Sequence, residues 1–145
     1  MRPEDDYLLA VGWAHYAFLY LEWEVIYVLH RITETELASL TDDSPRGLFR
    51  KLQKHWTDDP DYPNLVERYN DTVTRREHLA HSHPATLSDG MQRLHRYNIK
   101  RDKDRTVMFI ETDWLKQLAG DAIALNCEFN SFRVTRHSDQ TERTV

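Results

Sequence analysis

The chain has 145 residues, a formal net charge of -5 and a single cysteine. This length fits one domain whose core needs neither disulfides nor metal for stability. The negative charge excludes a uniformly basic, nucleic-acid-coating surface, although a local basic patch can still bind RNA. One cysteine excludes an internal disulfide, so we expect a cytoplasmic protein with a reduced, buried Cys127. The acidic N-terminus does not resemble a secretory signal.

The longest apolar segment, residues 7–31, predicts a long first helix. Glu22 and Glu24 lie within it, and because charges inside a bilayer are costly, it does not predict a membrane span. Apolar residues recur at helical spacing on two opposite faces, one aliphatic and one aromatic. The aromatic face, here called the aromatic stripe, consists of Trp13, Tyr16, Tyr20, Trp23 and Tyr27. Such a stripe is typical either of a core within the same chain or of an interface, and the sequence leaves both open.

Further helices are expected along the chain. A short helix is predicted over residues 34–40. Ser44 is a candidate N-cap followed by Pro45 at the first helical position, which predicts a second main helix to about residue 56. A third main helix should start near residue 63. The last helix is expected to be capped by Thr112 and to carry apolar residues every three or four positions, before a polar tail from about residue 135.

The sequence changes character between the third and last helices. Residues 82–90 are rich in turn-forming residues and predict a loop. Residues 91–97 and 106–110 flank a polar run, which predicts a β-hairpin inserted over about residues 91–110. The expected fold is therefore mainly α, a single domain over residues 1–145. It should be a bundle of about four main helices with a small β-hairpin between the third and the last.

Residues 73–86 concentrate arginine and histidine more than any other stretch. At about 100° per residue, Arg76 falls in the middle of the apolar face formed by Leu65, Tyr69 and Val73. A buried charge without a partner is costly, so Arg76 needs a partner or a chemical role. Glu22 lies in the same way on the aliphatic face of the first helix. We therefore expect Glu22 to contact Arg76 and to orient its guanidinium.

Arg76, four intervening residues and His81 form an Arg-x4-His pattern at the end of the third helix, and this pattern resembles the signature of HEPN-family proteins. The resemblance covers most of the chain. It implies a helical bundle, a homodimer with a cleft shared between protomers, and a metal-independent endoribonuclease of the toxin or defence-effector type that uses no cofactor. Its implied catalytic residues are Arg76 and His81. Many family members carry Asn or Asp where this chain has Glu77. The expected supporting residues are Glu22, Arg75, Glu77 and His83.

The chemistry of such a site follows from RNA itself. RNA carries its own nucleophile, the 2′-hydroxyl, so cleavage needs a proton-transfer group and a cation that stabilises the phosphorane. His81 would transfer protons near neutral pH, and Arg76 would hold the phosphate oxygens. In one unbroken helix these two side chains point about 140° apart, so a second copy would complete the site. The expected partners are RNA, a second copy of the chain, and an antitoxin or other partner protein, with no membrane.

Alternatives to this interpretation stay open. The run of residues 91–105 is the most basic segment, and its function is either to contact RNA phosphates or to form a solvated hairpin tip. The expected RNA-contacting residues are Arg93, Arg96, Lys100 and Arg101. Residues 73–86 also suit a solvated helix end, because cations favour a helix C-terminus. The chain would then be a catalytically inactive HEPN-like module that binds RNA or protein.

A metal site formed by His78, His81 and His83 is the third alternative, and it is disfavoured because these side chains diverge around the helix end.

Overall fold

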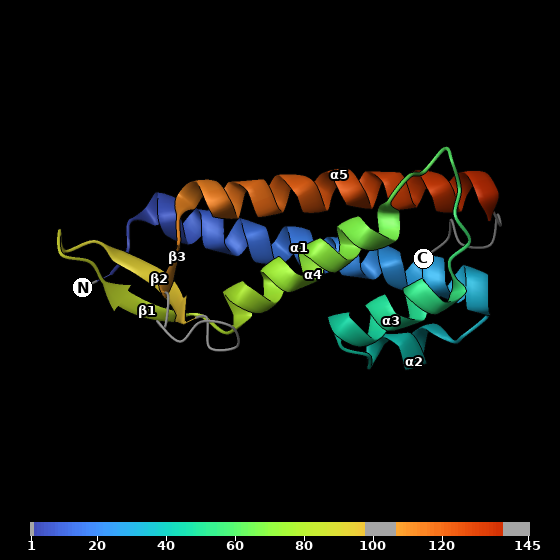
Figure 1. Ribbon diagram of the computed structural model, residues 1–145, viewed down its shortest axis with the longest axis horizontal. Coiled ribbons are helices and arrows are strands. Elements are labelled where there is room, and N and C mark those ends of the chain that lie inside the picture. The colour runs from blue at the N-terminus through green and yellow to red at the C-terminus, as the bar shows by residue number, and fades with distance from the viewer. Residues whose placement is uncertain (1, 98–106, 138–145) are drawn as a thin grey trace.

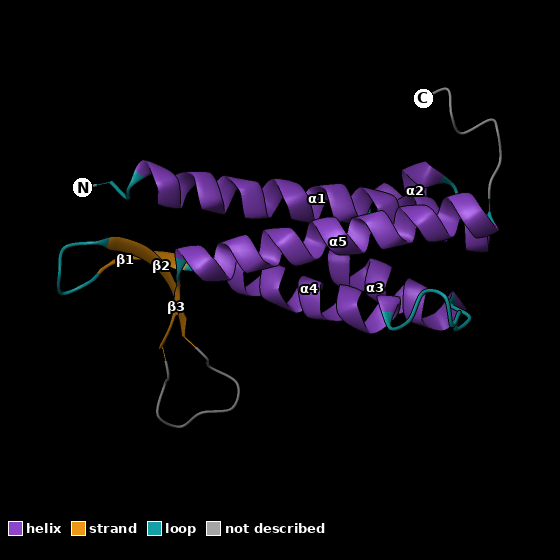
Figure 2. Ribbon diagram, turned by 90° about the horizontal axis from the view of Figure 1, so that it is seen from above, coloured by secondary structure: helices purple, strands orange, loops and turns teal. Residues whose placement is uncertain are grey.

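A computed structural model describes residues 2–97 and 107–137 of the chain. The fold is mainly α with a small antiparallel sheet between the last two helices, as the sequence predicted. In chain order the elements are α1 (Asp5–Thr33), α2 (Leu37–Thr41), α3 (Pro45–His55), α4 (Leu65–Ala80), β1 (His83–Thr86), β2 (Gln92–Tyr97), β3 (Val107–Ile110) and α5 (Thr112–Arg136). Helices α1 and α5 lie side by side along the long axis, with the sheet at the end where α1 begins and α2 and α3 at the other end (Figure 1, Figure 2).

The main hydrophobic core lies where α1 meets α3, α4 and α5. Phe18 and Leu29 of α1 are buried there together with Leu48 of α3, Tyr69 of α4 and Phe129 of α5. A second, smaller cluster at the sheet end contains Tyr7, Ala10, Ala14, Leu79, Ile110, Leu115 and Leu118. Because α1 contributes side chains to both clusters, it is the central element of the fold.

The helix boundaries follow local signals in the sequence at some positions and not at others. The hydroxyl of Ser44 accepts a hydrogen bond at 3.0 Å from a backbone N–H in the first turn of α3, and Pro45 is the first residue of that helix, so the predicted cap is confirmed. The start of α5 differs from the prediction, because Thr112 is its first residue and Glu111 takes the N-cap position without a capping hydrogen bond. Helix α5 also continues past residue 135 to Arg136, and residues 138–145 of the expected tail lie outside the described residues.

The sheet has three strands in the order β1-β2-β3, each antiparallel to its neighbour. Strands β2 and β3 are the two predicted strands. Strand β1 lies within residues 82–90, for which the sequence predicts a loop, and that prediction is wrong. The strand is at the sheet edge, its side chains are mostly exposed and it contains Pro84, so it lacks the alternation that identifies strands. Lys100 and Arg101 of the expected RNA-contacting set lie outside the described residues.

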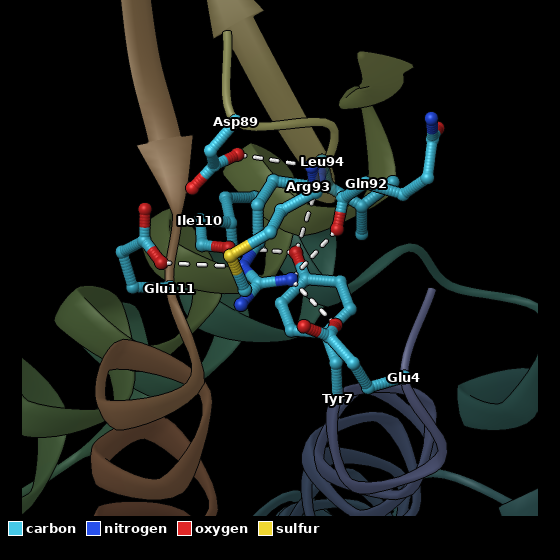
Figure 3. Close-up of polar contacts among 9 residues, drawn as sticks. Glu4, Tyr7, Asp89, Gln92, Arg93, Leu94, Ile110 and Glu111 are labelled. Carbon is cyan, nitrogen blue, oxygen red and sulfur yellow. Dashed lines mark hydrogen bonds and ion pairs between the residues drawn. The ribbon is translucent and has the colours of Figure 1, made fainter. Parts of the chain in front are cut away.

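Tyr7 of α1 joins the sheet to the helices. Its hydroxyl donates a hydrogen bond to the carbonyl of Ile110 at 2.6 Å and accepts one from the backbone N–H of Leu94 at 3.0 Å, so it connects β3 to β2 (Figure 3). The guanidinium of Arg93 lies over the Tyr7 ring, 4.5 Å from its centroid. Tyr7 therefore positions the sheet against the first turn of α1.

Arg93 is buried, with 8% of its surface exposed, and it makes ion pairs with Glu4 at 2.8 Å and with Glu111 at 3.3 Å (Figure 3). These carboxylates precede α1 and α5, so Arg93 ties the sheet to the starts of both long helices. The sequence-based expectation that Arg93 contacts RNA phosphates therefore has to be corrected. Its guanidinium is held inside the protein by two carboxylates and one aromatic ring.

Cys127 is exposed, which corrects the expectation of a buried thiol. Its neighbours Leu125 and Phe129 on α5 are buried in the core. Cys127 is two positions from each of them, so its side chain falls on the other side of the helix.

Among the described residues, no helix combines the length and hydropathy that crossing a membrane requires.

Replacing Tyr7 by phenylalanine should test the link between the sheet and α1. Loss of the hydroxyl leaves the carbonyl of Ile110 and the N–H of Leu94 without this partner, which typically costs about 1–3 kcal/mol. We expect Tyr7→Phe to lower the free energy of unfolding in urea by an amount in that range. Tyr16→Phe is the matched control, because Tyr16 is exposed and its substitution should leave stability nearly unchanged. Equal stabilities of the two variants would contradict this role of Tyr7.

Candidate functional site

Arg76 extends from α4 toward α1, where its guanidinium lies over the ring of Phe18 at 5.7 Å from the centroid. His15 and Glu22 lie three positions before and four positions after Phe18 in α1, and this spacing places all three on one face of the helix. Arg76 interacts electrostatically with both groups. We call His15, Glu22, Tyr69 and Arg76 the Arg76 cluster. His15, Glu22 and Arg76 are partly exposed, so the cluster lies at the edge of the core.

Glu22 is close to Arg76, as the sequence predicted, but the predicted direct contact is absent. Within the described part of the chain, no hydrogen bond or ion pair joins the two side chains. Burial raises the pKa of the Glu22 carboxyl, and the positive charge of Arg76 opposes this effect. Burial also lowers the pKa of His15, and Arg76 lowers it further because both groups would be cations. The neighbourhood was therefore predicted correctly, whereas the ion pair was not.

Tyr69 adds a polar atom to the base of this cluster. The residue is fully buried, and its hydroxyl has no hydrogen-bond partner among the described residues. Burial raises the pKa of this hydroxyl, and the negative charge of Glu22 adds to the effect, while Arg46 and Arg76 oppose it. A buried hydroxyl without a partner is unfavourable. The Arg76 cluster is thus a polar region that the described side chains do not fully satisfy.

His81 is the C-terminal cap residue of α4, and its side chain is exposed. Its backbone N–H donates to the carbonyl of Glu77 at 3.0 Å, so the residue still follows the turn of the helix. Five positions along a helix correspond to about 140° of rotation, and Arg76 is already turned toward α1. A single chain therefore does not bring Arg76 and His81 together around one small group.

The residues on either side of Arg76 fasten α4 to the other helices. Arg75 makes ion pairs with Asp71 at 2.8 Å and with Asp121 of α5 at 2.9 Å. Glu77 accepts a hydrogen bond at 3.1 Å from Nε of Arg46 in α3. The side chains expected to support catalysis at these two positions are thus engaged in holding three helices together.

The remaining site candidates lie near the end of α4. Nδ1 of His78 is 3.0 Å from the guanidinium of Arg96, which belongs to β2, and burial followed by this positive charge lowers the pKa of His78. Arg96 is therefore held beside the motif helix, whereas Arg93 is not. His83 is exposed in β1, and its carbonyl lies 2.7 Å from Nδ1 of His95. In the described residues, His78, His81 and His83 do not form a group suited to a metal ion.

Two residues of this region were not singled out by sequence reasoning. Phe18 lies one turn after His15 on the same face of α1, but an apolar residue on an apolar face gives no sign that it contacts Arg76. Arg46 follows a proline at a helix start, and nothing local indicates that it reaches α4. In comparisons with protein-family models, curated proteins and solved structures, the chain matched none of them.

Exchanging Glu22 for glutamine should reveal the balance between burial and attraction at this carboxyl. The pKa of Glu22 in the folded protein is raised above the ordinary value of 4.5. Between the ordinary pKa and the raised pKa, the folded protein therefore binds more protons than the unfolded chain. Above the raised pKa, the ionised carboxylate of Glu22 lowers the free energy of unfolding. We expect Glu22→Gln to raise the urea midpoint at about pH 7.5, and the gain to disappear toward about pH 4, where both side chains are neutral.

Glu67→Gln is the control for this exchange, because Glu67 is an exposed carboxylate on α4. Its urea midpoint should respond little to the substitution at either pH. A lower midpoint for Glu22→Gln near neutral pH would mean that attraction to Arg76 outweighs the penalty of burial.

Proposed function

We propose that this chain is a HEPN-like, metal-independent endoribonuclease in which Arg76 binds the scissile phosphate and His81 transfers protons. The Arg-x4-His pattern at the end of α4 supports the proposal. The observation that carries it is the state of Arg76. Among the described residues, Arg75 and Arg93 are each held by two carboxylates, but Arg76 has no carboxylate within ion-pair distance. Its planar set of N–H donors can therefore bind a phosphate in a bidentate manner.

The position of His81 agrees with a role in proton transfer. Its side chain is exposed at the end of α4, beside the start of β1, where a large substrate has access. The 2′-oxygen of RNA would attack the phosphorus as a base removes its proton, and the bond to the 5′-oxygen would break as that oxygen receives a proton. The products are a 2′,3′-cyclic phosphate and a 5′-hydroxyl. Histidine is suited to both transfers near neutral pH.

RNA binding in this proposal uses the end of the sheet next to the motif. Arg96 is partly exposed and is held against His78 of α4, so it is the described member of the basic run that lies closest to the motif. Lys100 and Arg101 remain predictions for RNA contact. A second copy of the chain would complete the site, because Arg76 and His81 diverge within one helix. The cytoplasmic location and an antitoxin or other protein partner are further parts of the proposal that rest on the sequence.

The alternative is a catalytically inactive HEPN-like module that binds RNA or protein. One observation favours it: Glu77, at the position where many family members carry Asn or Asp, is occupied by Arg46 of α3. That side chain is thus less available to a substrate than a shorter, unengaged polar group would be. The same exposed histidine and basic residues would then serve binding alone.

Replacing His81 by alanine is the direct test of catalysis. We expect the wild-type protein to cleave single-stranded RNA in the presence of EDTA and to leave 2′,3′-cyclic phosphate ends. Removing the proton-transfer group should lower the cleavage rate by at least about 10²-fold. His55→Ala is the matched control, because His55 is an exposed histidine at the end of α3, and α3 lies toward the other end of the molecule from the sheet (Figure 1). Its cleavage rate should equal that of the wild type.

Two results would contradict the nuclease proposal. Equal cleavage by the His81→Ala variant and the wild type would exclude His81 from the reaction. An absence of cleavage by the wild type, with RNA retarded in an electrophoretic mobility assay, would identify the inactive binding module instead.

A further inference from the structure

The small sheet has an inner face that packs against the helices and an outer face that carries exposed aromatic rings. Leu94 and Met108 pack against the second hydrophobic cluster, so they mark the inner face. Because side chains alternate along a strand, His95 and Tyr97 of β2 and Phe109 of β3 project from the outer face. Tyr97 and Phe109 expose 49% and 41% of their surface. A solvated sheet face is usually polar, so these rings need an explanation.

Strand register places the rings of the outer face beside one another. His83 of β1 is opposite His95 of β2, which is opposite Phe109 of β3, and residues opposite one another share a face. The ring of His95 lies 5.4 Å from that of Tyr97 and 6.3 Å from that of Phe109, centroid to centroid. Nδ1 of His95 is 2.7 Å from the carbonyl of His83, and this contact fixes the His95 ring. We call His83, His95, Tyr97 and Phe109 the ring platform.

We propose that the ring platform stacks unpaired bases of single-stranded RNA beside the phosphate that is attacked in the proposed reaction. The choice of RNA as the ligand rests on the proposed function. Aromatic rings exposed on a sheet bind single strands by stacking, because every base has a π face. His81 lies two residues before His83, so the platform begins directly after the end of α4. Arg96, the neighbour of His95 in β2, is held against α4 and brings a cation to this region.

The size and charge of the ring platform favour bases over a protein partner. An aromatic side chain carries roughly 150–250 Å² of surface, so the exposed parts of Tyr97 and Phe109 offer on the order of 200 Å². A standard protein interface buries about 800 Å² on each partner, whereas a single ring is enough to stack one base. The ring platform contains no carboxylate, and Glu4 and Glu111 at the sheet are paired with Arg93, which weakens their repulsion of phosphates.

Stacking on the ring platform defines the class of RNA that it takes. In a duplex the faces of each base are covered by the neighbouring bases, so a duplex offers no free face to the rings, whereas a single strand does. Rings contact the π face of a base and not the edge that distinguishes one base from another. The platform should therefore bind unpaired RNA with little preference for its sequence.

Fluorescence anisotropy with an uncleavable probe tests the ring platform. The probe is a labelled single-stranded RNA of about 12 nucleotides with 2′-O-methyl groups throughout, so it has no free 2′-hydroxyl to attack. We expect Phe109→Ala to raise the Kd about 10-fold, and to leave the salt dependence of the Kd unchanged because no phosphate contact is lost. Phe109→Leu, apolar but without a ring, should bind as weakly as Phe109→Ala. Phe109→Tyr keeps the ring and should bind as the wild type does.

Tyr16→Ala is the matched control, because Tyr16 is an exposed aromatic residue of α1, outside the sheet, and its loss should leave the Kd unchanged. A second measurement uses the wild-type protein alone. The probe with 4-thiouridine in place of uridine is irradiated, and mass spectrometry should locate the adducts on Tyr97 or Phe109.

Several outcomes would overturn the ring platform. They are an absence of probe binding by the wild type, a Phe109→Leu variant that binds as tightly as the wild type, adducts confined to α1, and a duplex bound as tightly as the single strand. The result is independent of catalysis, because the probe cannot be cleaved. Binding that depends on the Phe109 ring, in a protein that leaves unmodified RNA intact, would support the platform and contradict only the nuclease proposal.

Discussion

Burial of α1 against α5 determines where the other elements can lie. The contact extends along both helices: Asn126 of α5 donates a hydrogen bond to the carbonyl of Tyr20 at 3.0 Å, and Arg133 pairs with Glu24 at 2.7 Å. With α5 on one side of α1, α4 packs against the next face, where Phe18 and Leu29 complete the core. The third side of α1 is left to solvent or to another molecule. The candidate site and the exposure of most of the aromatic stripe are both consequences of this division.

The energetics of Arg76 differ from those of an arginine with a structural role. A cation over an aromatic ring contributes about 0.5–2 kcal/mol, and the contact with Phe18 offsets part of the cost of burying the guanidinium. Arg75, its neighbour in the sequence, bridges two helices through two carboxylates. Glu22 is close enough to play the same part for Arg76, yet burial raises its pKa and no ion pair forms. A contribution to the stability of the fold therefore explains why an arginine is found at position 75 better than it explains the arginine at position 76.

The parts of the fold that the sequence predicted depend on local physics. Helical spacing of apolar residues located the main helices, and the pair of Ser44 and Pro45 marked the start of α3 within the chain. The parts that it did not predict depend on contacts between distant segments. Strand β1 exists because β2 pairs with it, and Arg93 is buried because Glu4 and Glu111 meet at the sheet end. A basic residue in a basic run gives no local sign that it will be enclosed. The position of Glu22 near Arg76 was predictable from two buried faces, but the missing ion pair was not, because it depends on side-chain geometry between two helices.

The composition of α1 is difficult to explain by the stability of one chain. Positions 13, 16 and 20 project away from the described core, and polar residues there would preserve the helix and raise solubility. The sequence instead carries Trp13, Tyr16 and Tyr20, and the rings of Trp13 and Tyr20 each stack on the ring of Tyr16. On the opposite, aliphatic side of α1 lies the Arg76 cluster, where a guanidinium lacks a carboxylate partner within the described residues and the hydroxyl of Tyr69 lacks a hydrogen bond. Two sides of one helix are therefore unsatisfied in different ways, one by lack of apolar cover and one by lack of an anion. An apolar partner surface would cover the first, and under the proposed function a phosphate group of RNA would neutralise the second.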